Sequence, residues 1–190
     1  KYAALAREIH NQMAAETVLL NQRLAACLAG RTRAPDSFDD ARFSEAACLA
    51  RFTAAGWLTG LAYFHVMKQI AAYTCGHYAA ALEAAARAAP VLRQMTAMPV
   101  AATHRIYHAL TLAALYRAAP QQQQQAFAQT LAAQSAEFRR WAEHCPENFA
   151  HRHALVAAEI ARNQGRQLDA ERLFDQAIAA ARANGFIQYE

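Results

Sequence analysis

The sequence predicts an all-α protein made of antiparallel helix hairpins, and three observations indicate this fold class. Alanine supplies much of the 55% of hydrophobic residues, and alanine is the strongest helix former because its side chain loses no rotamer entropy on ordering. The 190 residues include only six glycines and five prolines. Between them, apolar residues recur at three- and four-residue spacings, as on one face of a helix. A chain of this length can bury a core, so we expect a single helical-repeat domain over 1–190.

The first predicted hairpin covers 1–55. Its first helix spans 1–29 and stops at Gly30, a residue that commonly ends helices. The next stretch, RTRAPDSFDDARF, contains one proline and several short polar residues of the type that caps helices, so it is a connection. We expect Asp36, Ser37, Asp39 or Asp40 to cap the second helix, which runs to about residue 55.

Three further hairpins are predicted over 56–98, 99–145 and 147–185. Gly76 separates the helices of the first of these. Pro99 and Pro120 each open a helix, at the position where the missing N–H of proline is not needed. The run of five glutamines after Pro120 is a solvated first helical turn, because glutamine is a good helix former. The last hairpin has helices over about 147–164 and 167–184 and closes at Gly185.

Two of these hairpins contain the same small-residue pattern. The turn glycine is followed by alanine five and twelve residues later, which gives Gly76, Ala81 and Ala88 in one hairpin and Gly165, Ala170 and Ala177 in the other. Glycine permits the left-handed turn, and small alanines let the second helix lie close to the first. This is the pattern of the second half of a tetratricopeptide repeat, whereas the first-helix tryptophan, leucine and glycine are not matched. The sequence therefore predicts degenerate repeats stacked as an α-α superhelix.

Charge and cysteine content favour a soluble, cytoplasmic chain. The net charge of +4 comes from arginines scattered along the sequence rather than from a basic stripe, so we expect no nucleic-acid partner. Charged or polar residues interrupt every apolar run before it reaches the length of a membrane span. The four cysteines lie far apart without a C-x-x-C pair, which is typical of reduced thiols. The chain begins at Lys1 without a methionine, and we interpret it as an internal fragment of a larger chain whose targeting cannot be judged.

The stretch WAEHCPENFAHRH has the highest density of metal-ligand residue types. His151 and His153 stand two apart on the predicted helix and would point about 200° away from each other, so they cannot both bind one ion. We expect Cys145 and Phe149 to be buried in the hairpin corner and His151 to bond to a backbone carbonyl or a glutamate. No metal ligand is predicted here, and His144 adds none.

His104 and His108 are better spaced, because residues four apart share a helix face and can share a metal. The zinc-protease pattern requires glutamate after the first histidine, and Arg105 stands there. We interpret the pair as surface or groove histidines whose hydrogen bonds are satisfied, and the alternative is that His104 and His108 belong to a ligand-binding groove. Most aromatic residues at helical spacing are expected to fill the core between hairpins. The sequence thus predicts no catalytic residue, no metal ligand and no cofactor.

The last fifty residues contain a recognisable set of residues: Trp141, Ala142, Cys145, Pro146, Glu147, Asn148, Phe149, His151, Glu159, Gly165, Ala170, Asp175, Ala177, Ile178, Ala181, Asn184, Gly185 and Phe186. With this set the segment resembles part of very large bacterial sensor kinases, in which a serine/threonine-kinase-like domain, an AAA-like ATPase, a tetratricopeptide-like helical region, a GAF domain and a histidine kinase follow one another. Upstream, FSEAACLARF and CGHYAAALEAA are weaker parts of the same region. The resemblance implies a position between the ATPase and the sensor or kinase domains.

No nucleotide-binding or kinase motif occurs in the sequence, so the expected function is non-catalytic. We expect a protein–protein interaction and signal-relay scaffold inside an ATPase-containing sensor kinase. Its partners would be the neighbouring ATPase, sensor and kinase domains, and another protein or a peptide. Two alternatives stay open at this point. One is the inducer-sensing helical region of an ATPase-type transcription activator, and the other is a metal-dependent or nucleotide-handling helical enzyme.

Overall fold

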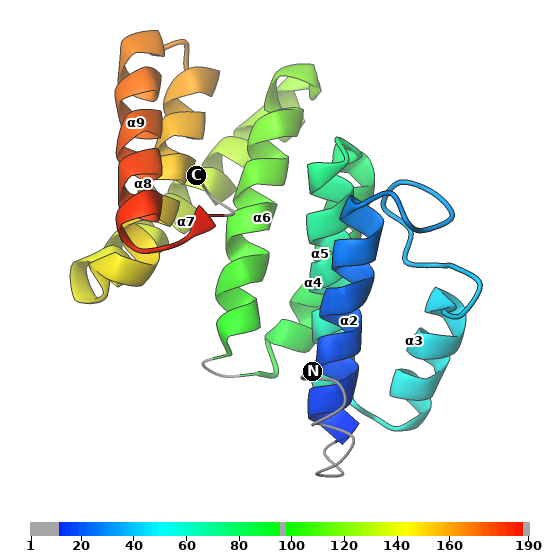
Figure 1. The fold of residues 1–190 in the computed structure, drawn as a ribbon. Coiled ribbons are helices and arrows are strands. Elements are labelled where there is room, and N and C mark those ends of the chain that lie inside the picture. Colours follow the sequence, from blue (N-terminus) through cyan, green and yellow to red (C-terminus); the bar gives the residue numbers. More distant parts are fainter. Residues whose placement is uncertain (1–11, 96–97, 188–190) are drawn as a thin grey trace. The chain divides into compact units, whose positions relative to one another are not determined.

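The computed structural model describes residues 12–95 and 98–187, and every regular element in these ranges is a helix (Figure 1). The elements are α2 (Gln12–Leu28), α3 (Glu45–Ala54), α4 (Leu58–Thr74), α5 (Tyr78–Leu92), α6 (Pro99–Leu115), the 3-10 turn η1 (Tyr116–Ala118), α7 (Gln121–His144), α8 (Pro146–Asn163) and α9 (Gln167–Ala183). The all-α prediction is confirmed for this part of the chain. The first eleven residues of the helix predicted over 1–29 lie outside it.

The predicted turn glycines end helices as expected. At Gly76 the backbone φ is +79°, and the amide of the following His77 donates to the Ala72 carbonyl at 2.8 Å. At Gly165 the φ is +75°, and the amide of Arg166 donates to the Ala161 carbonyl at 2.9 Å. This is the Schellman arrangement, in which a left-handed glycine lets the chain satisfy the last carbonyls of the helix. Gly30, Gly56 and Gly185 end their helices in the same way.

The chain forms two compact units, Lys1–His108 and Ala109–Glu190. In the first unit α4 is the central helix, with nine of its 17 residues buried. It packs against α5 in the predicted hairpin, and also against α2 and α3. The two helices of the predicted 1–55 hairpin thus both lie on α4, and an ion pair between Glu16 and Arg51 (2.9 Å) joins them. The largest side chains of this core are Phe38, Phe52, Phe64 and Leu20.

In the second unit α7, α8 and α9 pack in chain order, each against the next. The tightest pair is α8 with α9, which run side by side in Figure 1. The repeat alanines lie at its centre, because Ala170 and Ala177 are 1% and 3% exposed. Their counterparts in α5, Ala81 and Ala88, are completely buried. The repeat alanines of both hairpins are therefore buried, as expected for small residues between paired helices.

One helix start differs from the predicted one. Helix α5 ends at Leu92, with Arg93 as its C-cap, inside the hairpin predicted over 56–98. Helix α8 begins at Pro146, because proline fits the first helical position, where its missing N–H leaves no hydrogen bond unmade.

No helix in the described ranges is long and apolar enough to cross a membrane. All four cysteines are free thiols, with Cys27 and Cys48 buried.

Candidate functional site

The predicted groove histidines lie where α6 packs near α4 in the first unit. His104 and His108 are half-buried, and their rings are nearly parallel, with an interplanar angle of 11° and centroids 5.7 Å apart. The buried side chain of Gln69 on α4 makes two polar contacts with His104. Its Oε1 lies 2.9 Å from the ring Nδ1, and its Nε2 donates to the His104 carbonyl at 3.1 Å. The structure thus adds a partner, Gln69, that stands 35 residues away in the sequence.

Both imidazoles are held in the neutral form. Burial lowers the pKa of His104 to about 4, with smaller contributions from His108 and from the positive charge of Arg105. Burial also lowers the pKa of His108. A neutral imidazole carries one N–H donor and one acceptor lone pair. At neutral pH the pair therefore adds no positive charge to this part of the α4–α6 contact.

Aromatic side chains continue this part of the α4–α6 contact. Tyr73 on α4 packs edge-on against Tyr107 on α6 with ring centroids 5.6 Å apart, and against Tyr78 at the start of α5 at 5.5 Å. All three are half-buried. Tyrosine has an apolar ring and a polar hydroxyl, so it is suited to a partly buried position. The surface beside the histidines is thus apolar with polar edges.

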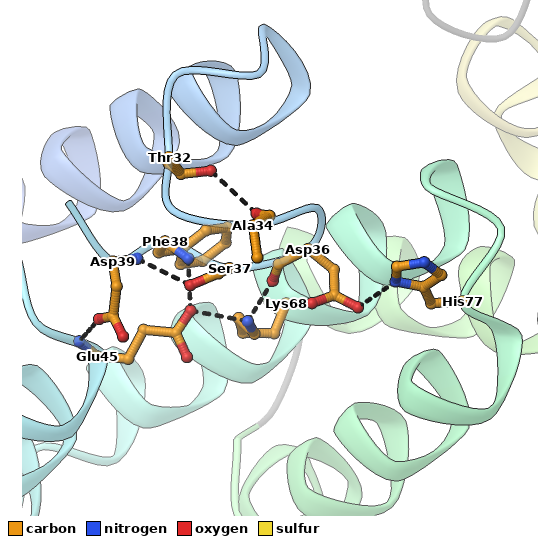
Figure 2. A network of polar contacts seen from close by, with 9 residues as sticks. All are labelled: Thr32, Ala34, Asp36, Ser37, Phe38, Asp39, Glu45, Lys68 and His77. Atoms are coloured by element: carbon orange, nitrogen blue, oxygen red, sulfur yellow. Dashed lines mark hydrogen bonds and ion pairs between the residues drawn. The ribbon is translucent and has the colours of Figure 1, made fainter.

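A second polar cluster ties the loop 31–44 to α4 and to the α4–α5 turn. Figure 2 shows Lys68 reaching from α4 to the Asp36 carbonyl and to the Glu45 carboxylate, the latter at 2.7 Å. The Asp36 carboxylate meets the ring of His77 at 2.6 Å. Asp36 has a φ of +58°, a conformation that aspartate tolerates better than most residues. Three contacts from one lysine and one aspartate therefore hold the middle of the loop.

The loop is also anchored by a fully buried aromatic ring. Phe38 is 0% exposed and packs edge-on against Phe64 of α4, with ring centroids 6.0 Å apart. The Lys68 ammonium lies 5.1 Å from the centre of the Phe38 ring, within cation–π range. The Phe38 amide donates to Glu45 at 2.5 Å. The segment predicted only as a connection thus contributes Phe38 to the core of the unit.

The predicted cap of α3 needs correction. Ser44 is the N-cap, and its hydroxyl accepts from the Ala47 amide at 3.3 Å. None of the four predicted residues, Asp36, Ser37, Asp39 and Asp40, is the N-cap. Asp39 nevertheless accepts from the first helical amide, that of Glu45, at 2.6 Å. Four short polar residues close to one helix start make the capping residue ambiguous from sequence alone.

In the second unit, several residues that carry the family resemblance form an aromatic cluster at the α7–α8 junction. Trp141 packs against Phe138 (5.4 Å) and against Phe149 (5.1 Å). The guanidinium of Arg152 lies over the rings of Phe149 and Phe186, at 5.5 and 5.9 Å. Trp141 and Phe149 thus take part in packing that joins consecutive helices.

His151 belongs to the same cluster and does not face His153. It is 1% exposed and stacks on Phe186, with ring centroids 4.4 Å apart. Burial, and secondarily Arg152, lowers its pKa to about 4. His153 is half-buried and His144 is exposed. In the described ranges, no three His, Cys, Asp or Glu side chains come together as metal ligands.

Cys145 links α7 and α8 at the hairpin corner. Its sulfur accepts from the Asn148 side chain at 3.0 Å, and its S–H lies 3.8 Å from a Glu147 carboxylate oxygen. Cys145 and Phe149 are half-buried rather than buried, because the corner opens to solvent. Pro146 starts α8, and Glu147 in the first turn complements the positive end of the helix dipole. These contacts give this part of the motif a structural role at the helix junction.

The structure therefore brings His104 and His108 together and places the other motif residues in turns and packing contacts. Sequence analysis missed Gln69, Lys68 and Asp36 as organising residues, because their partners are distant in the chain. Comparison with protein-family models, with curated proteins and with solved structures found no match to the chain.

Proposed function

We propose that this chain is a non-catalytic helical-repeat scaffold of the tetratricopeptide-like class, which binds neighbouring protein domains and relays changes between them. The observation that carries the proposal is the equivalence of the α4–α5 and α8–α9 hairpins. Each has a left-handed turn glycine followed by buried alanines at the same two offsets. One structural unit used more than once is the basis of solenoid scaffolds.

The composition of the surfaces also supports binding rather than catalysis. Helix α9 carries the exposed Leu168, which is 82% accessible, beside charged residues on the same helix. The first unit exposes Met13, Leu28 and Leu58 in part. Apolar side chains at the surface of a helical repeat are common contact points for partners.

The proposed mechanism follows from the mechanics of stacked hairpins. Each hairpin contacts only its neighbours, so a small change in the angle between helices accumulates along the stack. A partner that binds one arrangement better than another shifts the population toward that arrangement. In the larger sensor kinase that the sequence resembles, this would couple the ATPase to the sensor and kinase domains.

Two experiments test the proposal. Reading the coding sequence on both sides of residues 1–190 should reveal an ATPase module upstream and a sensor or kinase domain downstream; a DNA-binding helix-turn-helix downstream instead would favour the transcription-activator alternative. The immobilised chain, exposed to lysate and to the separately expressed flanking domains, should retain at least one of those domains. Retention of none of them, with a chain that is folded by circular dichroism, would contradict the relay function.

A further inference from the structure

The loop 31–44 carries three exposed arginines, Arg31, Arg33 and Arg42. Other arginines of the first unit pair with carboxylates, as Arg23 does with Asp40. The guanidinium groups of the three loop arginines form no ion pair, hydrogen bond or ring contact with any residue that the structure describes. They are therefore free to contact another molecule.

The carboxylates of the same unit are already occupied. In the described part of the unit each contacts a cation, an imidazole or a backbone amide: Glu16 with Arg51, Asp36 with His77, Asp39 with the Glu45 amide, Asp40 with Arg23, Glu45 with Lys68, and Glu83 with Arg87. No unpaired carboxylate in these residues competes for the free arginines of the loop. Complementary charge on a partner favours its encounter with such a surface.

The backbone of the loop holds the three arginines in fixed positions. Their amides are hydrogen-bonded, in chain order, to the Ala26 carbonyl at 2.8 Å, the Asp39 carbonyl at 2.9 Å and the Asp40 carboxylate at 2.6 Å. The buried ring of Phe38 anchors the middle of the loop. A partner therefore binds a loop whose backbone is already ordered, and less conformational entropy is lost on binding.

An exposed apolar side chain stands close to these arginines in the chain. Leu28, in the last turn of α2, is 46% exposed and precedes Arg31 by three residues. Arginine is enriched in protein–protein interfaces, where apolar contacts exclude water from the polar pairs around them. The end of α2 and the loop thus offer both kinds of contact.

The chemistry favours carboxylates over nucleic-acid phosphates as the partner groups. A guanidinium group can pair with a carboxylate through two parallel hydrogen bonds. A nucleic-acid strand binds through many phosphates at once, and three arginines in a loop that also contains three aspartates offer few such contacts.

We infer that the loop 31–44 and Leu28 form a docking surface for an acidic peptide segment of a partner protein. Glutamates or aspartates of the segment pair with Arg31, Arg33 and Arg42, and an apolar residue of the segment covers Leu28. The inference rests on the proposed scaffold function, because it names the chemistry of a partner that the scaffold binds.

The test uses the full 190-residue chain and a fluorescein-labelled peptide of glutamate, leucine and glycine, followed by fluorescence anisotropy. Binding should be saturable and should weaken as sodium chloride is added, because salt screens exposed charges. The same peptide with glutamine in place of glutamate should not bind. Arg31→Gln, Arg33→Gln and Arg42→Gln should each weaken binding by about two- to fivefold, as for exposed ion pairs.

Arg93→Gln is the matched control. Arg93 is also exposed and has no partner among the described residues, but it is the C-cap of α5. The start of α5 lies beside the loop, where His77 contacts Asp36, and the 15 residues of the helix place Arg93 about 22 Å away. Its substitution should leave peptide binding unchanged.

A charge-reversal variant separates loss of binding from loss of folding. Replacing the three loop arginines together, by Arg31→Glu, Arg33→Glu and Arg42→Glu, should abolish binding of the glutamate peptide and create binding of a matching lysine peptide. An unfolded chain would not make this exchange. Leu28→Ser should weaken binding of the glutamate peptide without changing its dependence on salt.

The inference would be overturned by absence of saturable binding, by equal binding of the glutamine peptide, or by loop variants that behave like Arg93→Gln. Tighter binding of single-stranded DNA or of phosphatidylserine vesicles than of the glutamate peptide would also overturn it. If the peptide binds and the flanking domains do not, the docking surface stands and the scaffold function is wrong. If the flanking domains bind and the peptide does not, the scaffold function stands and the docking surface is wrong.

Discussion

Alanine substitutions at Gly76 and Gly165 test whether the two repeat turns are physically equivalent. The backbone φ is +79° at the first and +75° at the second, and an added Cβ would meet no heavy atom within 4 Å at either position. The cost of alanine is therefore the left-handed conformation alone, about 1–2 kcal/mol. The lower entropy of the unfolded alanine chain offsets part of this, about 0.4–1 kcal/mol. We expect a net loss of about 1 kcal/mol, equal at both positions.

The assay is urea unfolding followed by far-UV circular dichroism, in which both variants should lower the midpoint without changing the slope m. Asparagine at the same positions should cost less than alanine, because asparagine visits the left-handed region. Gly60→Ala is the contrasting control, since Gly60 lies inside α4 and an added Cβ would overlap the ring of Trp57. The loss of stability in Gly60→Ala is steric. Gly60→Asn should therefore lose more stability than Gly60→Ala. Alanine variants as stable as the original, or asparagine no better than alanine at residues 76 and 165, would refute the reasoning.

The remaining predictions concern the loop 31–44 and the buried histidines. Phe38→Ala removes a 0%-exposed ring and should cost about 3–5 kcal/mol in urea unfolding, while Phe38→Leu should cost much less; equal costs would mean that the ring is not packed. Lys68→Met removes both contacts to Asp36 and Glu45 and should speed amide hydrogen exchange in residues 36–40. Arg87→Met on α5 is the exposed control. Unchanged exchange in the Lys68→Met variant would show that the lysine does not hold the loop. Burial holds the pKa of His65 and His151 at about 4, below the ordinary 6.5, so the unfolded chain binds more protons between these values. The free energy of unfolding is therefore not reduced by these histidines above pH 6.5. It should fall as the pH drops toward 4, by up to about 1.4 kcal/mol per pH unit for each histidine. In the His151→Gln variant the slope of unfolding free energy against pH should be smaller; an identical slope would contradict the assignment.

Much of the helical framework could be predicted because its signals are local. A glycine with an apolar pattern on each side specifies a turn within a few residues, which is why Gly76 and Gly165 were identified correctly. The burial of Ala81, Ala88 and their counterparts in α9 follows from the same short-range pattern. Such features depend on side-chain size and on the backbone conformations that a residue can adopt, and both follow from the residue type.

The polar contacts could not be predicted because they join distant segments. Asp36 meets His77 across 41 residues, and Lys68 meets Glu45 across 23. Nothing in the composition of the loop distinguishes the buried Phe38 from an exposed aromatic residue. The contact between His104 and Gln69 is likewise identified only once α4 and α6 lie together. The choice of Ser44 as the N-cap among several short polar residues depends on where the loop is anchored.

The most direct test of the scaffold function is a binding isotherm between the purified 190-residue chain and the ATPase domain proposed to precede it. Biolayer interferometry should give saturable binding, and hydrogen exchange of the complex should show protection confined to surface residues of the helices. Leu168→Glu, at an 82%-exposed position of α9, and Leu58→Glu, at a 39%-exposed position of α4, would then locate the contact. No saturable binding to the ATPase, sensor or kinase domains by a chain shown to be folded would contradict the proposal that these hairpins serve as a scaffold.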